Sequence, residues 1–594
     1  MTAKQQIEKD LGMPVSPSAV DICDYQCNAA FALAKQRNST ADKLSAVEKT
    51  TPMDVAREIA AKFKSSVATA EAAAPGFVNF RVTDAELLKQ AQGILQSGNL
   101  PIEKRDFGRT IFFDYGGANI AKELHVGHLR SPIIGEAMKR VFQALGGKTV
   151  SDTFLGDWGL QIGLVIAELE LHNKLPSKVE GGTACGGVSD LITLENLNYL
   201  YPRASARSKT DPAFKARAEE ITLKMQQQQQ PYFDIWKKIR DVSVAKIREN
   251  YGTLNCTFDT FNGESHAQKY VPEVLETLKK AGAYISDNCL IMDVKEDTDT
   301  GPMPPILLQK SNGGELYSTT DAATIFYRFR DHAPNEFIYF IDARQELHMK
   351  QVFRCAQIGG LVAPGTRLMH VSYGTMNGSD GKPFKTRAGG TIKFEEVIDM
   401  VTEAAAKRLA ENGKATDADL AQKIGIAALK FADLSNHVRK DYIFDIEKFT
   451  NFEGKTGPYI LYTIARINSL FKKAFKHPVT PSARHSVTVP MLLETSSPDS
   501  HLRVELFGTA RAVIIKTLKL ADCYPAAAAN YTLNGIVDAA FALAAEFNLF
   551  YANTKILTEP DADKRSGYLE ICQIVKIALE FAMNTLAIDV VEEM

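Results

Sequence analysis

The segment NIAKELHVGHLR, residues 119–130, gathers side chains that can do chemistry. His125 and His128 stand three positions apart with Gly127 between them, and Arg130 follows closely. Paired imidazoles can ligate a metal ion or donate hydrogen bonds to phosphate, and they can also simply pack in a core. The surrounding residues help to distinguish these possibilities.

The spacing of the histidines disfavours a metal site. A zincin helix places two histidines four residues apart with a glutamate after the first, as HExxH. Here the spacing is three, Val126 and Gly127 fill the gap, and Glu123 precedes the first histidine. The eight cysteines form no CxxC pair and no cluster at zinc-ligand spacing. We therefore expect no metal held by protein ligands.

A second candidate motif is GSDGKPFKT, residues 378–386. It resembles the GxxxxGK[ST] phosphate loop, but Met376 occupies the position of the first glycine and Pro383 that of the serine or threonine. The Walker interpretation therefore fails. Lys382 and Lys385 could still bring positive charge to a triphosphate from a glycine-rich loop.

The two motifs together favour phosphate chemistry. Gly127 would let a base or ribose approach the backbone, and two histidines near a helix N-terminus can donate to phosphate oxygens. Either motif alone is explained more simply, by capping or core histidines or by a solvated basic loop. Their occurrence on matching β-α units makes the phosphate interpretation specific.

Two predicted β-α-β units position these motifs. The first has a strand at 110–115, the histidine loop, an amphipathic helix at 131–147 and a strand near 148–154. The second has a strand at 336–344, a helix at 348–360 and a strand at 367–376. Such units predict a doubly wound parallel sheet whose ligand lies beyond the carboxyl ends of the strands. The intervening residues form a predicted insertion, and the sequence becomes strongly helical from about residue 395.

The composition of the chain sets broad limits. Its 594 residues exceed a single core and predict two to four domains. With 45% hydrophobic residues, 24% charged residues and a net charge of −2, it is typical of a soluble protein without an overall basic field. No apolar run reaches the length of a membrane-spanning helix, and the N-terminus lacks the apolar region of a signal peptide. We expect a cytoplasmic protein with no membrane partner.

The motifs resemble those of a known family. HVGH (125–128) is similar to the HIGH motif of class I aminoacyl-tRNA synthetases, and KPFKT (382–386) to a variant of their KMSKS loop. The flanking segments GDWGLQIG, FDTFNGES, LYSTTDAA and YFIDARQELHMKQ resemble arginyl-tRNA synthetases in particular. The resemblance extends to DYQCNAAFALAK and PGFVNF near the N-terminus, and to DYIFDIEKFTNFEGKTGPYI and LAIDVVEEM towards the end. Only parts of the insertion and residues 475–500 lack a match.

The resemblance implies an α/β architecture. It consists of a Rossmann-like, doubly wound catalytic domain with an insertion, a small α/β N-terminal domain and an all-α C-terminal domain. The implied bounds are 1–104 for a tRNA-binding domain, 105–395 for the catalytic domain with its insertion at about 170–300, 396–440 for a helical connection that completes the catalytic unit, and 441–594 for an anticodon-binding domain.

The implied reaction has two steps. The carboxylate of L-arginine attacks the α-phosphate of Mg²⁺-ATP to give arginyl-adenylate and pyrophosphate, and the arginyl group then passes to the 2′-hydroxyl of the terminal adenosine of tRNA(Arg). Because substrate oxygens are the nucleophiles, the protein has to position the reactants and stabilise charge. The resemblance further implies that adenylate formation requires bound tRNA, and we expect a monomer.

Family positions map onto residues of this sequence in three groups. Those acting on the phosphates are His125, His128, Lys382, Lys385 and Lys122. Those of the ATP site are Gly127, Gly156, Asp157, Trp158, Gly159 and His348. Those binding arginine are Asp114, Asn119, Tyr317, Asp321 and Gln345. Asp321 and Tyr317 would bind the guanidinium with Asp114 nearby, because carboxylates match its fork of donors.

Simpler roles remain for some of these residues. A lone aspartate could cap a helix, His348 could cap the helix that it opens, and Lys122 could be a solvated loop lysine. Arg130 receives no role.

The chain departs from the family pattern at two places. Gly116-Gly117-Ala118 stand where the family has serine-rich triplets ending in proline, and Pro383-Phe384 replace Met-Ser in the lysine loop. These changes put a hydroxyl contact and the mobility of the lysine loop in doubt.

Other functions fit the sequence less well. A non-catalytic tRNA-binding relative would have lost one of the two motifs, and a small nucleotidyltransferase would not need the C-terminal helices. A glutamyl or glutaminyl synthetase would need a basic pocket, and a cysteinyl synthetase would need a zinc thiolate site.

Overall fold

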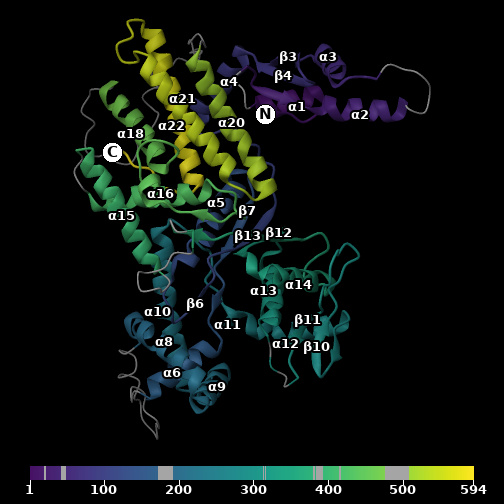
Figure 1. The fold of residues 1–594 in the computed structure, drawn as a ribbon, viewed down its shortest axis with the longest axis vertical. Helices are drawn as coiled ribbons and strands as arrows, with labels where there is room; N and C mark the ends of the chain where they lie inside the picture. Colours follow the sequence, from purple (N-terminus) through teal and green to yellow (C-terminus); the bar gives the residue numbers. More distant parts are fainter. Residues whose placement is uncertain are drawn as a thin grey trace.

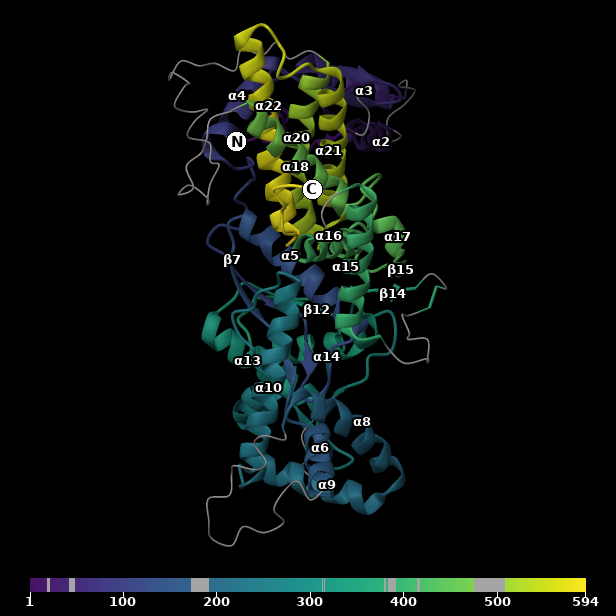
Figure 2. The same ribbon diagram turned by 90° about the vertical axis from the view of Figure 1, so that its left-hand side faces the viewer.

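A computed structural model describes residues 1–18, 22–41, 49–171, 192–311, 314, 316–378, 381–382, 392–413, 417–474 and 508–594. The central parallel sheet lies in the middle of an elongated molecule, with the C-terminal helices and the N-terminal domain at one end (Figure 1). The inserted elements lie at the other end. Figure 2 shows the same order from the side.

The central sheet is parallel and doubly wound, as the sequence predicted. Its strands are β5 (Thr110–Asp114), β7 (Lys148–Asp152), β12 (Glu336–Asp342) and β13 (Arg367–Tyr373), in the order β13-β12-β5-β7. Helix α5 (Arg130–Ala144) connects β5 to β7, and α14 (Glu346–Ile358) connects β12 to β13. Phe113 packs in the same core as α5, whereas Phe112 packs with α14 and α13 (Tyr317–His332). Because successive side chains of a strand point to opposite faces, helices cover both faces of the sheet.

The insertion consists of two parts. The first is helical and comprises α6 (Leu160–Leu171), α8 (Leu194–Thr210), α9 (Pro212–Gln226) and α10 (Tyr232–Thr253). The glutamine run, residues 226–230, begins at the last residue of α9 and continues as a turn. The second part comprises α11 (Glu264–Ala267), α12 (Val271–Lys280) and an antiparallel sheet of β9 (Tyr284–Ser286), β10 (Cys289–Met292) and β11 (Ile306–Gln309). It shares a hydrophobic core with α13 and α14.

The N-terminal domain is a small α/β unit, as predicted. Its sheet has the order β1-β2-β4-β3 and is formed by Ser16–Pro17, Tyr25–Cys27, Phe77–Val82 and Ala68–Ala73. Its helices are α1 (Ala3–Leu11), α2 (Ala29–Ala41), α3 (Pro52–Lys62) and α4 (Asp84–Ser97).

This domain packs against the end of the chain. Tyr25 donates to the buried carboxylate of Asp522 at 2.8 Å, and Arg511 donates to Asp24 at 2.8 and 3.0 Å. Ile514 and Leu518 of α20 (Thr509–Asn530) belong to the hydrophobic core of the N-terminal domain. The two ends of the chain therefore form one packed body.

From Phe394 to the end, the described part of the chain is helical apart from the two-residue strand Tyr442–Ile443. It contains α15 (Phe394–Glu411), α16 (Ala418–Leu434), α17 (Ile446–Phe449), α18 (Gly457–Ala474), α20, α21 (Asn534–Asn553) and α22 (Ala562–Thr585). By length and composition, α21 is the one described helix apolar enough to cross a membrane. It packs between α20 and α22 through a single stripe, which comprises Ile536, Val537, Ala540, Leu543, Ala544, Phe547 and Phe550. Such a stripe is typical of a helix in a bundle.

One buried arginine joins the strands of the central sheet. Arg328 of α13 is fully buried and donates to Asp114 at the end of β5 and to Asp152 at the end of β7, both at 2.6 Å. It also donates to the hydroxyl of Tyr339 on β12 at 3.1 Å. Three neighbouring strands are thus linked to one helix by a single side chain.

Replacing Arg328 by methionine should strongly destabilise the domain built on the central sheet. The change leaves two buried carboxylates without a counter-charge, which costs on the order of 3–5 kcal/mol. Urea unfolding followed by tryptophan fluorescence measures the change in stability. Trp158 and Trp236 pack together, with ring centroids 4.9 Å apart, where the first part of the insertion joins the sheet. Their fluorescence should therefore change when this region unfolds.

Arg330 on the same helix provides the control. Its ion pair with Glu273 is long, 3.5 Å, and its side chain is 47% exposed. The Arg330→Met change should cost less than about 1 kcal/mol. Equal unfolding midpoints for the two variants would contradict the role given to Arg328.

Candidate active site

A cavity of about 420 Å³ lies at the carboxyl ends of β5 and β12, the edge that the sequence predicted. The predicted site residues that line it are Asp114, Asn119, Gly127, His128, Gly156, Tyr317, Asp321 and Gln345. They come from the loop after β5, the short strand β8 (Leu155–Gly156), helix α13 and the turn after β12. The fold thus gathers residues that are up to 231 positions apart between Asp114 and Gln345.

The histidine loop is a turn of 3₁₀ helix, Val126–His128. The Nδ1 atom of His125 accepts from the backbone N–H of Gly127 at 3.1 Å, and Nδ1 of His128 accepts from the N–H of His125 at 3.1 Å. A Cβ atom on Gly127 would lie 2.8 Å from the ring of His125. The missing side chain of Gly127 therefore makes room for His125 as well as for a ligand in the cavity.

Both histidines are neutral at physiological pH. Burial lowers the pKa of His128 to about 3, with further lowering by His125 and Lys122. Burial and then Lys122 lower the pKa of His125. A neutral imidazole that accepts at Nδ1 carries its proton on Nε2. Each ring thus has an Nε2–H group that can donate a hydrogen bond.

The two predicted lysines that the structure describes, Lys122 and Lys382, do not line this cavity. Lys122 borders a neighbouring cavity of about 280 Å³ together with Lys246 and Lys393. Lys382 is exposed, and its carbonyl accepts from the N–H of Gly378 at 2.8 Å. Lys385 lies outside the described residues.

Strand β8 brings Gly156 beside the loop after β5. Its parallel partner is β6 (Ala118–Asn119), and a Cβ atom on Gly156 would overlap the side-chain oxygen of Asn119. Glycine at this position therefore lets the Asn119 amide lie along the wall of the cavity.

The next residues turn away from the cavity. Asp157 is fully buried and accepts from the backbone and hydroxyl of Ser265 at 2.9 and 2.8 Å and from Arg240 at 2.9 Å. The Trp158 ring packs on Trp236, while its backbone N–H donates to Glu264 at 3.3 Å. Neither Asp157, Trp158 nor Gly159 lines the cavity, so these residues support the adjoining segment.

His348 connects two of the residues that the sequence assigned to arginine, Asp321 and Tyr317. The Nε2 atom of His348 lies 2.6 Å from a carboxylate oxygen of Asp321, and its ring packs on Tyr317 with centroids 4.6 Å apart. His348, which the sequence assigned to the ATP site, therefore touches the arginine set. Asp114 is already bound by Arg328, and burial raises its pKa to about 6 against the attraction of that arginine.

Glu264 is a cavity-lining carboxylate that the sequence did not single out. Among the described residues, no lysine or arginine forms an ion pair with it. Burial, followed by the nearby charge of Asp157, raises its pKa to about 7. The only local signal was an acid directly after a glycine in FDTFNGES, which equally suits the first turn of a helix.

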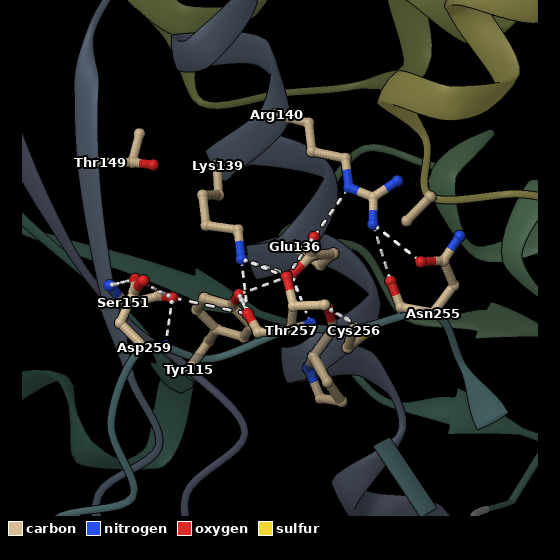
Figure 3. Close-up of polar contacts among 12 residues, drawn as sticks. Tyr115, Glu136, Lys139, Arg140, Thr149, Ser151, Asn255, Cys256, Thr257 and Asp259 are labelled. Atoms are coloured by element: carbon tan, nitrogen blue, oxygen red, sulfur yellow. Dashed lines mark hydrogen bonds and ion pairs between the residues drawn. The ribbon is translucent and has the colours of Figure 1, made fainter. Parts of the chain in front are cut away.

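A buried polar cluster holds the segment before Glu264 (Figure 3). The carboxylate of Glu136 on α5 accepts from Tyr115 at 2.7 Å, from Arg140 at 2.7 Å and from the backbone N–H of Thr257 at 3.0 Å. It also forms an ion pair with Lys139 at 2.8 Å. The helix that follows the histidine loop therefore also anchors the chain that leads to Glu264.

Among the described residues, no three histidine, cysteine, aspartate or glutamate side chains are grouped to hold a metal ion. The chemistry available in the cavity is that of carboxylates, amides, backbone groups and one neutral histidine. Such a set can bind a cationic side chain at one end and an anion through hydrogen bonds at the other.

Comparisons with known proteins cover nearly the whole chain. Residues 90–446 match the family model "tRNA synthetases class I (R), catalytic domain", residues 460–594 the "DALR anticodon binding domain" and residues 3–82 the "Arginyl tRNA synthetase N terminal domain". An arginine–tRNA ligase from Alkaliphilus oremlandii is 38% identical over 99% of this chain and 96% of its own length. An arginine–tRNA ligase from Agathobacter rectalis is 38% identical over 97% of this chain and 94% of its own length.

Two solved structures share the fold over the full chain. Arginyl-tRNA synthetase from Plasmodium falciparum has a TM-score of 0.79 at 22% identity and covers 100% of this chain and 98% of its own. The Thermus thermophilus arginyl-tRNA synthetase has a TM-score of 0.76 at 21% identity, with coverage of 100% and 99%.

The protonation of His128 can be measured directly. Because burial lowers its pKa to about 3, its ring should stay neutral, with the proton on Nε2, from pH 5 to pH 9. Proton–nitrogen NMR spectra of protein with ¹⁵N-labelled histidine, assigned with a His128→Gln variant, report the tautomer and the titration. A titration midpoint near the ordinary histidine value of about 6.5 would contradict the geometry.

Proposed function

The chain belongs to the arginyl-tRNA synthetase family, and on this premise we propose that arginine and ATP react in the cavity beyond β5 and β12. The protein is a class I arginine–tRNA ligase, which activates L-arginine with ATP and transfers the arginyl group to tRNA(Arg). The proposal assigns the parts of this reaction to residues of the chain.

Two carboxylates form the proposed guanidinium site. Glu264 and Asp321 line the same cavity, and neither is bound by a lysine or arginine of the described chain. A guanidinium entering between them supplies the missing positive charge and its donors match carboxylate oxygens. This pair of available carboxylates is the observation that carries the substrate assignment, because an anionic amino acid would be repelled.

The other residues assigned to arginine are proposed to form the wall and the mouth of the site and to bind the backbone groups of the amino acid. Asp114 contributes to the wall, since its charge is compensated by Arg328. Tyr317, which is 62% exposed, forms the mouth of the site with His348 behind it. We assign Asn119 and Gln345 to the α-amino and carboxylate groups of arginine, because both line the cavity and can donate and accept.

The ATP phosphates are assigned to the histidine loop. The Nε2–H groups of His125 and His128 are proposed to stabilise the negative charge that develops on the α-phosphate as the arginine carboxylate attacks. Neutral imidazoles suit this task because they donate hydrogen bonds without a proton transfer. Lys122, Lys382 and Lys385 are proposed to attract the leaving pyrophosphate, and ATP enters as its Mg²⁺ complex.

The glycine-rich stretch after β7 is assigned to the nucleotide. Gly127 and Gly156 line the cavity and leave space for the ribose and base. Asp157 and Trp158 support the site indirectly, because Asp157 accepts from the backbone of Ser265 and the backbone N–H of Trp158 donates to Glu264. Gly159 is assigned to the same stretch.

The end domains are proposed to bind the tRNA. We assign residues 1–104 to its corner and residues 441–594 to its anticodon, with residues 105–440 forming the catalytic unit. The catalytic unit also uses Tyr442–Ile443, which pair with Met376–Asn377. We further propose a monomer that works in the cytoplasm.

Replacing His128 by alanine should slow adenylate formation. Loss of one donor to a developing charge costs about 10²–10³-fold in rate, or roughly 2.7–4 kcal/mol of barrier, and should leave the KM for arginine nearly unchanged. Pyrophosphate exchange driven by arginine, with and without cognate tRNA, measures this. Near-normal exchange would refute the role of the histidine, and exchange driven by any other amino acid would refute the substrate.

The affinity for arginine should depend on pH through Glu264. Its pKa of about 7 means that the carboxyl group is mostly neutral at pH 6 and mostly ionised at pH 8. Arginine stays positively charged throughout this range, so its KM should rise by up to about tenfold from pH 8 to pH 6.

The Glu264→Gln variant is the matched control. It should bind arginine weakly but with no such pH dependence, whereas Asp321→Asn should weaken binding and keep the dependence. A wild-type KM for arginine that is flat between pH 6 and pH 8 would argue against Glu264 as a ligand of the guanidinium.

A further inference from the structure

We infer that Arg130 is a positioning residue that sets the distance between the histidine loop and the strand leading to Lys382. The inference rests on the phosphate roles proposed for these two motifs. Arg130 begins helix α5, two residues after His128, and is only 2% exposed. Its side chain is bonded to Asp433, which lies 303 positions further along the chain.

Arg130 forms a fork with one buried carboxylate. Its Nε and Nη2 atoms donate to the two oxygens of Asp433 at 3.0 and 3.3 Å, and Asp433 is 1% exposed at the end of α16. Its Nη1 atom donates to the carbonyl of Lys440 at 3.1 Å. Such paired donors fix both the distance and the plane of the two groups.

Tyr442 links Arg130 and Asp433 to the strand that precedes the lysine motif. Tyr442 of β15 (Tyr442–Ile443) donates to Asp433 at 3.1 Å, and the guanidinium of Arg130 lies over its ring, 5.1 Å from the centroid. Tyr442 in turn pairs with Met376 of β14 (Met376–Asn377), and its N–H donates to the carbonyl of Thr375 at 3.1 Å. β14 and β15 lie beside α15 and α16 in Figure 2.

The chain after the lysine motif is also attached to the histidine loop. The N–H of Val126 donates to the carbonyl of Ile392 at 3.1 Å, and the N–H of Phe394 donates to the carbonyl of Leu124 at 3.0 Å. The described residues on both sides of the lysine motif are therefore held by the histidine segment. On one side the link is backbone pairing, and on the other it runs through the side chain of Arg130.

This arrangement has a consequence for the reaction. Histidine and lysine side chains must act on the same triphosphate, so the distance between their segments decides whether both can reach it. A displacement of about 1 Å in such a pair can cost on the order of 10²-fold in rate. The arginine pocket, by contrast, contains no residue of the Arg130–Asp433–Tyr442 cluster.

Replacing Arg130 tests the inference in the full-length enzyme. In Arg130→Met, adenylate formation per active site should fall about 10- to 100-fold and the KM for ATP should rise. The KM for arginine should stay within about twofold, as should transfer of arginine to tRNA from preformed adenylate, since that step has no pyrophosphate to hold. Active-site titration normalises every rate to the amount of folded enzyme.

Arg354→Met is the matched control for a purely structural effect. Arg354 on α14 is also buried, at 7% exposed, and forms a fork with Asp299 at 2.6 and 2.8 Å. It should lower stability similarly but leave the KM for ATP and the rate per active site unchanged. If Arg130→Met behaved like Arg354→Met, the inference would be wrong.

Two milder variants keep the test decisive if Arg130→Met does not fold. Arg130→Lys retains the charge but cannot form the fork, and Tyr442→Phe retains the ring but loses the hydrogen bond to Asp433. Both should raise the KM for ATP and not that for arginine, and unchanged values in both would overturn the inference. The His128→Ala variant distinguishes failure of the Arg130 inference from failure of the proposed function. A normal rate of adenylate formation in His128→Ala would refute the phosphate role of the histidine loop, on which the inference rests.

Discussion

The guanidinium of Arg328 is the interaction on which the catalytic domain depends. It is fully buried between the ends of β5 and β7, and it forms an ion pair with one carboxylate from each strand. Charges are costly to bury singly, so this helix and these strands can pack only in the register that brings all three groups together. The loops that carry the histidines and the glycine-rich stretch start from these two strand ends. The geometry of the cavity is therefore set by a contact that is not part of it.

The acidic groups around the cavity differ in whether an arginine of the chain binds them. Asp114, Asp321, Asp342 and Glu264 all line it. Arg328 binds Asp114 and Arg344 binds Asp342, whereas no lysine or arginine of the described chain forms an ion pair with Asp321 or Glu264. These two are the carboxylates that we propose for the guanidinium of the substrate. The histidine loop follows a different rule, because its rings are held neutral by burial and by backbone N–H groups that occupy Nδ1. Charge on one side of the cavity and neutral donors on the other match a cationic amino acid and an anionic nucleotide.

Much of this could be predicted from the sequence, and the exceptions share a physical cause. The apolar runs in TIFFDY and EFIYFIDAR predicted strands of the doubly wound sheet, and the family resemblance predicted eight residues that line the cavity. The sequence did not predict that Glu264 lines the cavity while Asp157 is buried behind it, because Asp157 is held by Arg240 and Ser265, which lie 83 and 108 positions further along the chain. Arg130 had no role for the same reason, since its partner Asp433 lies 303 positions away. Local patterns specify elements, whereas long-range polar contacts decide where each side chain points.

The docking of the N-terminal domain on α20 has a consequence for how the molecule can be divided. Ile514, Ile515 and Leu518 are covered by that domain, as are Ile574 and Ile577 of α22. Removing residues 1–104 would leave these apolar side chains facing water, together with the unpaired carboxylate of Asp522 and the guanidinium of Arg511. The N-terminal domain therefore cannot be deleted or exchanged without exposing this interface. Any domain that replaced it would have to present the same apolar face and the same charged groups to the C-terminal helices.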